Sequence, residues 1–200
     1  MPKRRIKKLL IDGYIETAAL NGSRFFYPII FVTNAISMSY DEPVMKQLLR
    51  SIPQIGKVEW IGIREERKAT PKSVEKVDAK KKTGLEGDHF KGSLSGKRQV
   101  TLIQKEHLNA VATILGKEAI DPKSTRRNIV VSGINLLSLK SQQFKIGQAI
   151  LETSGICAPC NRMEENLGPG GYSAMRGHGG ITARVIADGE INIGDNVSLI

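Results

Sequence analysis

Two cysteines stand in one short phrase, Cys157-Ala-Pro-Cys160, and they are the only cysteines of the chain. The phrase follows a run rich in β-forming residues, 143–154, and precedes a glycine-rich stretch, 168–180. A thiol between a strand and a loop that carries cations suits a nucleophile, a sulfur carrier or a metal ligand. The placement of the pair therefore indicates one of these three kinds of site.

The remaining residues narrow the choice. A thioredoxin-type redox pair would open a helix within a βαβ unit, whereas the residues that flank this pair predict β-structure. A structural zinc site needs four ligands, and the chain has three histidines and no second CxxC. A single functional thiolate needs a cationic, partly exposed setting, which Arg162, Arg176 and His178 could supply. The alternative is that both cysteines are small buried residues without a chemical role.

Two other short motifs carry groups that bind ligands. Arg126, Arg127 and Asn128 precede a buried strand, where guanidinium forks and an amide suit a phosphate or a heterocycle. Asp88 and His89 lie in a turn with two glycines, 84–89. In both motifs the alternative is a hydrogen-bonded or solvated loop without a ligand.

The charge and composition limit the class of protein. The chain has 200 residues and a net charge of +10, of which residues 1–8 carry +5 and residues 64–82 carry +4. Aromatic residues are only 5% and are not interleaved with these basic segments, so solvated basic segments are favoured over a nucleic-acid site. No apolar run approaches the roughly 20 residues that span a bilayer. We expect a cytoplasmic protein whose thiols are free or coordinating.

The pattern along the chain predicts an extension followed by one domain. Residues 1–44 contain no motif or repeat, and we expect a loosely ordered N-terminal extension there, with the domain at 45–200. The glycine-rich stretch is interpreted either as a ligand-binding loop or as a disordered connector. We predict a loop at 65–82, a helix at 105–115 stopped by Gly116, a helical turn at 161–166, a turn at Gly189-Glu190, and strands at 57–64, 98–104, 128–132, 145–152, 180–187 and 191–200. Short strands and few helices predict a mainly β fold, a barrel with a few short helices, rather than an α/β sheet.

The motifs, in this order, resemble those of the MOSC domain family, named for the C-terminal domain of molybdenum-cofactor sulfurase. The resemblance covers about residues 50–200. It rests on VEWIGIR (58–64), GLEGDH (84–89), QVTLIQKEHL (99–108), RNIVV (127–131), Ile146-Gly147, Cys157-Ala-Pro-Cys160, GHGG (177–180) and Ile193-Gly194-Asp195.

The resemblance implies a MOSC-type β-barrel that binds the molybdenum cofactor. Cys160, the cysteine of the Pro-Cys pair, matches the single cysteine that ligates molybdenum in reductases of N-hydroxylated compounds, and a soft thiolate suits that metal. The implied cofactor-binding residues, which include those around an anionic pterin phosphate, are Arg127, Asn128, Arg162, Arg176, His178, Asp88 and His89.

The resemblance also bears on partners and leaves two functions open. The chain shows no iron–sulfur cysteine set, so a reductase built on it needs a separate electron donor and a small-molecule substrate. The alternative is a sulfur carrier in which Cys160 bears a persulfide, Cys157 resolves it and another protein donates the sulfur. Pyridoxal phosphate binding is a label of the family for which no lysine is identifiable here. A third hypothesis, that the chain is a module that binds polyanions through its basic segments, has little support.

Overall fold

The computed structural model divides the chain into two compact units, Met1–Val44 and Met45–Ile200. In the first unit three short antiparallel strands form a sheet in the order β1-β2-β3. The expectation of a loosely ordered extension falls largely on residues outside those that the structure describes. The described residues are 9–11, 14–18, 24–28, 43–90 and 96–200, and the three strands are β1 (Leu9–Ile11), β2 (Tyr14–Ala18) and β3 (Arg24–Pro28).

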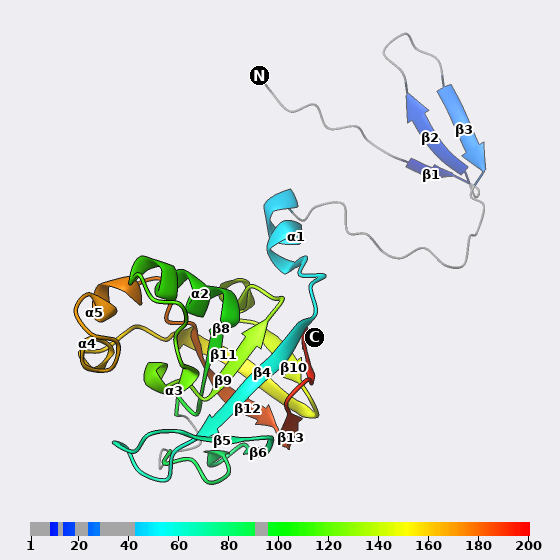
Figure 1. The fold of residues 1–200 in the computed structure, drawn as a ribbon. Coiled ribbons are helices and arrows are strands. Elements are labelled where there is room, and N and C mark those ends of the chain that lie inside the picture. The colour runs from blue at the N-terminus through cyan, green and yellow to red at the C-terminus, as the bar shows by residue number, and fades with distance from the viewer. Residues whose placement is uncertain (1–8, 12–13, 19–23, 29–42, 91–95) are drawn as a thin grey trace. The chain divides into compact units, whose positions relative to one another are not determined.

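The second unit is built on a closed barrel of seven strands (Figure 1). Their order is β14-β10-β11-β12-β8-β9-β4, and pairing of β14 with β4 closes the ring. The far end of β4 pairs with an eighth strand, β5. The bounds are β4 (Gly56–Ile63), β5 (Lys72–Val74), β8 (Val100–Gln104), β9 (Ile129–Ser132), β10 (Gln143–Ile146), β11 (Ala149–Ile156), β12 (Ile181–Ala187) and β14 (Asn196–Leu199).

A second, three-stranded sheet and several short helices complete the unit. The sheet has the order β13-β6-β7. The elements are β6 (Lys76–Lys80), β7 (Gly84–Leu85), β13 (Gly189–Asn192), α1 (Val44–Arg50), α2 (Lys105–Ile114), α3 (Pro122–Thr125), the 3₁₀ helix η1 (Leu136–Leu139), α4 (Arg162–Leu167) and α5 (Gly171–Ala174).

Alternation of apolar and polar residues fills the barrel interior. In β10 the side chains of Phe144 and Ile146 are buried, whereas Gln143 and Lys145 are exposed. This alternation is the two-residue period of a strand. Leu151 of β11 and Val197 of β14 point into the same buried cluster. The interior is therefore packed with side chains.

A second apolar cluster holds α2, α4 and α5 on one side of the barrel (Figure 1). The buried face of α2 contains Leu108 and Val111, at the spacing of one helix face. They pack with Met163 of α4 and Met175 beyond α5, and Ile103 of β8 contributes from the barrel wall. This packing fixes α4, and α4 begins just after the second cysteine.

The mainly β barrel is confirmed, and so is the helix stopped at Gly116, whose φ of +63° suits glycine. Several boundaries were wrong. The single strand expected at 145–152 is the hairpin of β10 and β11, turned at Gly147 with φ +55°. The loop expected at 65–82 contains β5 and β6, and the closing strand expected at 191–200 is two strands.

Two further features differ from the expectation. The barrel is mixed, because β8 and β9 are parallel and joined through α2 and α3. The expected turn at Gly189-Glu190 belongs to β13, where Gly189 pairs with Ala79. The glycine-rich stretch, 168–180, contains α5. It is therefore an ordered segment, and the alternative of a disordered connector was wrong.

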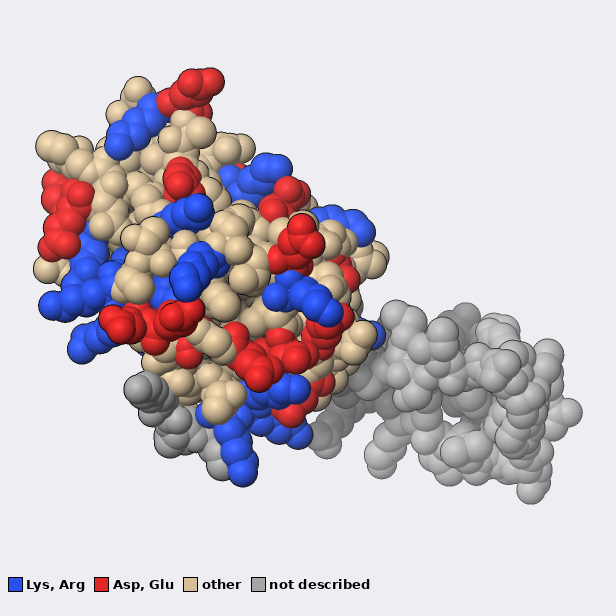
Figure 2. Space-filling model, turned by 60° about the horizontal axis from the view of Figure 1, so that its bottom comes forward, with Lys and Arg blue, Asp and Glu red and all other residues tan. Residues whose placement is uncertain are grey.

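On the face that Figure 2 draws, the described basic residues do not form one continuous surface. Figure 2 shows Lys and Arg side chains interspersed with Asp and Glu over the face that it draws. Within the basic segment 64–82, Lys72 pairs with Glu65 at 2.7 Å and Lys76 with Glu190 at 3.0 Å. No helix in the described part of the chain is long and apolar enough to cross a membrane.

Candidate functional site

The two cysteines lie in a short loop between β11 and α4, and they differ in exposure. Cys157 is buried, with 4% of its surface exposed, whereas Cys160 is exposed, and both are free thiols. The Cys157 N–H donates to the Gly180 carbonyl oxygen at 2.9 Å, and the Cys160 carbonyl oxygen accepts from the Met163 N–H at 2.8 Å. The loop is therefore fixed at both ends and presents Cys160 to solvent.

Arg127 joins three segments behind this loop. Its guanidinium donates to the carbonyl oxygens of Thr125 (2.8 Å), Cys157 (3.0 Å) and Gly179 (2.7 Å). The side chain is buried, and burial lowers the pKa of Arg127, whereas the Cys157 and Cys160 thiols act in the opposite direction. Arg127 was expected to bind a phosphate; here its hydrogen bonds hold the backbone around the cysteines.

The GHGG segment packs tightly against the same loop. A side chain on Gly179 would collide with the Cys157 carbonyl oxygen and approach Arg127 Nη2 to 3.0 Å. Gly180 has φ +79°, and a side chain there would collide with the Leu102 carbonyl oxygen. These two glycines therefore permit close approach between backbone segments of the protein itself.

Four arginines gather around the cysteines. Burial lowers the pKa of Arg126, the positive charges of Arg64 and Arg162 lower it further, and Cys160 acts in the opposite direction. Burial also lowers the pKa of Arg64, which the Asp88 carboxylate opposes and Arg127 reinforces. Mutual repulsion of this kind is relieved when an anion binds.

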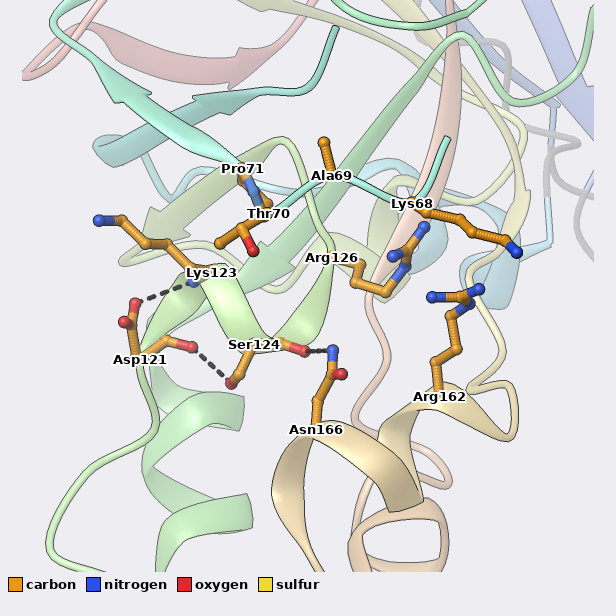
Figure 3. A pocket seen from close by; sticks show the side chains of 10 residues that line it. All are labelled: Lys68, Ala69, Thr70, Pro71, Asp121, Lys123, Ser124, Arg126, Arg162 and Asn166. Carbon is orange, nitrogen blue, oxygen red and sulfur yellow. Dashed lines mark hydrogen bonds between the residues drawn. The ribbon is translucent and has the colours of Figure 1, made fainter. Parts of the chain in front are cut away.

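A basic pocket of about 300 Å³ adjoins this group of arginines (Figure 3). Its cationic side chains are Lys68, Lys123, Arg126 and Arg162, and in Figure 3 those of Lys68, Arg126 and Arg162 extend on the same side. The pocket is also lined by one acidic residue, Asp121. Its Oδ1 accepts a hydrogen bond from the Lys123 N–H at 2.9 Å and so caps the N-terminus of α3. We call this cavity the basic pocket.

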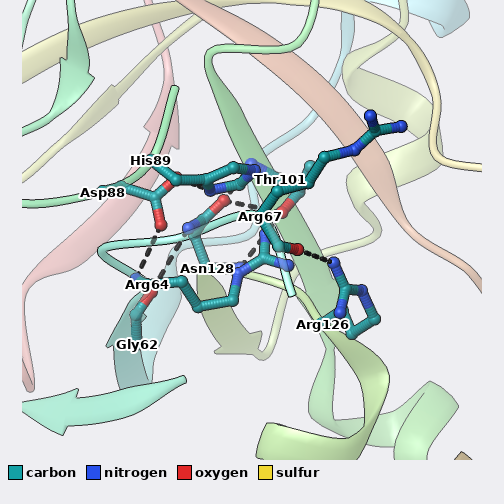
Figure 4. Close-up of polar contacts among 8 residues, drawn as sticks. All are labelled: Gly62, Arg64, Arg67, Asp88, His89, Thr101, Arg126 and Asn128. Carbon is teal, nitrogen blue, oxygen red and sulfur yellow. Dashed lines mark hydrogen bonds and ion pairs between the residues drawn. The ribbon is translucent and has the colours of Figure 1, made fainter. Parts of the chain in front are cut away.

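The elements around the basic pocket are tied together by polar contacts. Asn166 Nδ2 of α4 donates to the Ser124 carbonyl oxygen of α3 at 2.7 Å. Arg126 has a left-handed φ of +60°, and its Nη2 donates to the Arg67 carbonyl oxygen at 2.7 Å (Figure 4). The pocket is thus assembled from the loop before β5, α3 and α4.

Asn128 lies beneath the site and links three strands (Figure 4). Its Oδ1 accepts from the Thr101 N–H at 3.1 Å and the Thr101 hydroxyl at 2.7 Å, and its Nδ2 donates to the Gly62 carbonyl oxygen at 3.2 Å. Asp88 Oδ1 accepts from the Arg64 N–H at 2.8 Å, and Asp88 Oδ2 lies 3.2 Å from His89 Nδ1. Both expected ligand groups therefore make hydrogen bonds that hold the end of β4.

The two other expected residues of this region, Arg176 and His178, do not line the basic pocket. His178 packs its ring edge-on against His107 of α2, with centroids 5.0 Å apart and an interplanar angle of 76°. The Nδ1 atoms of both rings are buried without a hydrogen-bond partner among the described residues. Arg176 is exposed, and its side chain makes no hydrogen bond or ion pair with that part of the chain.

The sequence did not indicate that Arg64, Lys68 and Lys123 belong to the candidate site. Arg64 ends the KVEWIGIR strand, and an arginine at a strand end is usually solvated. One signal was available: the strand continues directly into Glu65-Glu66-Arg67-Lys68, so Arg64 and Lys68 come from one strand end and its loop. Lys123 had no signal of its own, because α3 is a single turn.

A comparison with known families assigns the chain. The model of the MOSC domain matches residues 72–198, which is most of the sequence. The chain belongs to the MOSC domain family. The match includes both cysteines, all of α3 and α4, and every cation of the basic pocket except Lys68. Related proteins of this family bind the molybdenum cofactor.

Solved structures share the barrel of this MOSC domain. The YuaD protein from Bacillus subtilis is 23% identical, with a TM-score of 0.65 over 72% of this chain and 95% of that chain. YiiM from Geobacillus stearothermophilus is 16% identical (TM-score 0.60, 72% and 75% covered) and YiiM from Escherichia coli 18% identical (TM-score 0.55, 72% and 69% covered). At these identities the likeness shows the fold. No curated protein gives a significant match.

The residues of this MOSC domain fit a cofactor that carries its own metal ligands. Among the described residues, no three His, Cys, Asp or Glu side chains are grouped closely enough to hold a metal ion. Cys160 offers one soft, solvent-accessible ligand, and the remaining soft ligands would come from the pterin dithiolene. The basic pocket offers the positive charge that a pterin phosphate requires.

Proposed function

We propose that this MOSC domain is a cytoplasmic molybdenum-cofactor protein in which Cys160 is the metal ligand and the basic pocket takes the cofactor phosphate. The reaction that we assign to it is the reduction of a small N-hydroxylated compound, with electrons from a separate donor protein. The observation that carries this proposal is the juxtaposition of an exposed thiol with a group of arginines, of which Arg126 and Arg162 make no ion pair with the described residues.

Each group would have a distinct role. Cys160 would hold the metal, while Arg126, Arg162 and Lys68 would bind phosphate oxygens, for which the guanidinium fork is suited. Arg127 would keep the cysteine loop in place through its three carbonyl bonds. When bound, the cofactor supplies two-electron oxo-transfer chemistry.

The test is molybdenum analysis of protein expressed in a host that makes the cofactor. We expect near-stoichiometric molybdenum in the unchanged chain and its loss in Cys160→Ser. Cys157→Ser is the matched control, because it removes the buried thiol three residues away and should retain the metal. Full molybdenum in Cys160→Ser would overturn the assignment of the ligand, and absence of the metal from all three proteins would overturn the cofactor itself.

A second function is favoured by the neighbouring buried thiol. A sulfur carrier would bear a persulfide on exposed Cys160, and Cys157 would resolve it and release the sulfur. Mass analysis that finds one extra sulfur on Cys160, without molybdenum, would select this function. In that case Cys157→Ser should slow sulfur release, whereas a cofactor protein should be little affected by it.

A further inference from the structure

We propose that Cys157 and Cys160 form a redox pair, in which a hydroperoxide oxidises exposed Cys160 and Cys157 captures the product as an intramolecular disulfide. The pairing itself is independent of the cofactor. Its consequence, reversible loss of the metal-binding thiolate, rests on the proposed function.

The two thiols differ in exposure to solvent, as a reacting thiol and a resolving thiol require. Cys160 is exposed and meets a dissolved oxidant, whereas Cys157 is 4% exposed and is shielded from it. Oxidation by peroxide follows exposure, so Cys160 is the residue that reacts first. Cys157 then serves as the resolving thiol, three positions away in the same loop.

The backbone determines which cysteine moves. Cys157 is held on both sides, because its N–H donates to Gly180 and its carbonyl accepts from Arg127. Cys160 has its carbonyl bonded to the Met163 N–H and lies in the irregular segment before α4. Disulfide formation therefore proceeds by rotation of the Cys160 side chain toward a fixed Cys157.

Both cysteines influence one buried cation, Arg127. The Arg127 guanidinium contacts the Cys157 backbone, and the pKa of Arg127, lowered by burial, is raised by Cys157 first and by Cys160 second. One buried guanidinium therefore contacts the backbone of the loop that carries both cysteines.

The chemistry balances without a further reagent. The Cys160 sulfur attacks one peroxide oxygen, an S–O bond forms, the O–O bond breaks, and the oxygen that leaves takes a proton as water or alcohol. The Cys157 sulfur then attacks the Cys160 sulfur, an S–S bond forms, the S–O bond breaks, and hydroxide leaves with the Cys157 proton as water. Two thiols are oxidised by two electrons and one peroxide is reduced.

The experiment is intact-mass analysis of the full chain after titration with hydrogen peroxide. We expect the loss of two hydrogen atoms and of both titratable thiols, with recovery by dithiothreitol. Trypsin should leave both cysteines in one peptide, 146–162, since no lysine or arginine lies between Lys145 and Arg162. The disulfide is therefore read directly from the mass of that peptide.

Three variants separate the roles. Cys157→Ser should instead gain two oxygen atoms on Cys160 that dithiothreitol does not remove, and Cys157→Ala repeats the test with a residue that suits a buried site. Cys160→Ser should stay unmodified at the same dose. Identical oxygen addition in the unchanged chain and in Cys157→Ser, or disulfides only between two chains, would overturn the pairing.

Molybdenum content before and after oxidation tests the consequence separately. Loss of the metal on disulfide formation, and its retention in the untreated protein, would support both proposals. An intramolecular disulfide in a protein that never binds molybdenum would leave the redox pair standing and remove the proposed cofactor.

Discussion

Arg127 and Cys157 are joined by a hydrogen bond from the Arg127 Nη2 to the Cys157 carbonyl oxygen, 3.0 Å long, across 30 positions of sequence. The same guanidinium reaches Gly179, 52 positions away. One buried side chain thus fixes the cysteine loop against the GHGG segment.

Replacement of Arg127 should destabilise the domain. Arg127→Met leaves three buried carbonyl oxygens without their donor, and we expect the free energy of unfolding to fall by about 3 kcal/mol. Urea unfolding followed by circular dichroism measures the change. Arg98→Met is the control, because Arg98 is exposed, and its effect should stay within about 0.5 kcal/mol. Equal effects of the two replacements would contradict the role given to Arg127.

Alanine substitutions at two glycines of the GHGG segment should lower the free energy of unfolding by different amounts. Gly179→Ala should cost about 3 kcal/mol, because the added methyl group collides with the Cys157 carbonyl oxygen. Gly177→Ala should cost about 1 kcal/mol, because Gly177 has φ +81° but open space around it. Thermal unfolding of both variants compares them. A larger loss in Gly177→Ala would show that backbone strain outweighs contact with the cysteine loop.

The sequence predicted the barrel, but it held no sign of the contacts that the candidate site makes within the protein. Strand alternation and glycine turns are local signals, so β4, β8, β9 and α2 were placed within a few residues of their observed bounds. The partners of Arg127 and Asn128 are mainly backbone groups of distant segments, which leave no signature in side-chain types. Ligand binding by these two residues stays a prediction, and the sequence held no sign of the hydrogen bonds by which they hold strands and loops.

The basic pocket illustrates the same limit. Lys68, Lys123 and Arg162 come from three segments that no periodic pattern connects. Their convergence depends on the pairing of β5 with β4 and on the contact between α3 and α4. Such a pocket follows only from the tertiary fold.

The pair of histidines predicts a dependence of stability on pH. Burial lowers the pKa of His107, and the neighbouring His178 lowers it further, with Glu106 acting in the opposite direction. The unfolded chain therefore binds a proton more readily, and stability declines as the pH falls through the ordinary value of about 6.5 toward the lower pKa of the folded state. The difference in melting temperature between the unchanged chain and His107→Gln, followed from pH 8 to pH 5, isolates this effect. A difference that does not vary with pH would show that His107 takes up its proton equally in both states.

The basic pocket should bind inorganic phosphate by itself. Arg162→Gln removes a pocket cation whose side chain makes no hydrogen bond or ion pair with the described residues, so we expect unchanged folding and a loss of affinity of about tenfold. Isothermal titration of the purified chain with phosphate measures the dissociation constant, which should rise with salt because the contact is ionic. Lys140→Gln, which removes an exposed lysine outside this pocket, is the matched control and should leave the constant unchanged. Equal weakening in both variants would mean that phosphate responds to net charge alone, and the basic pocket would then lose its assignment.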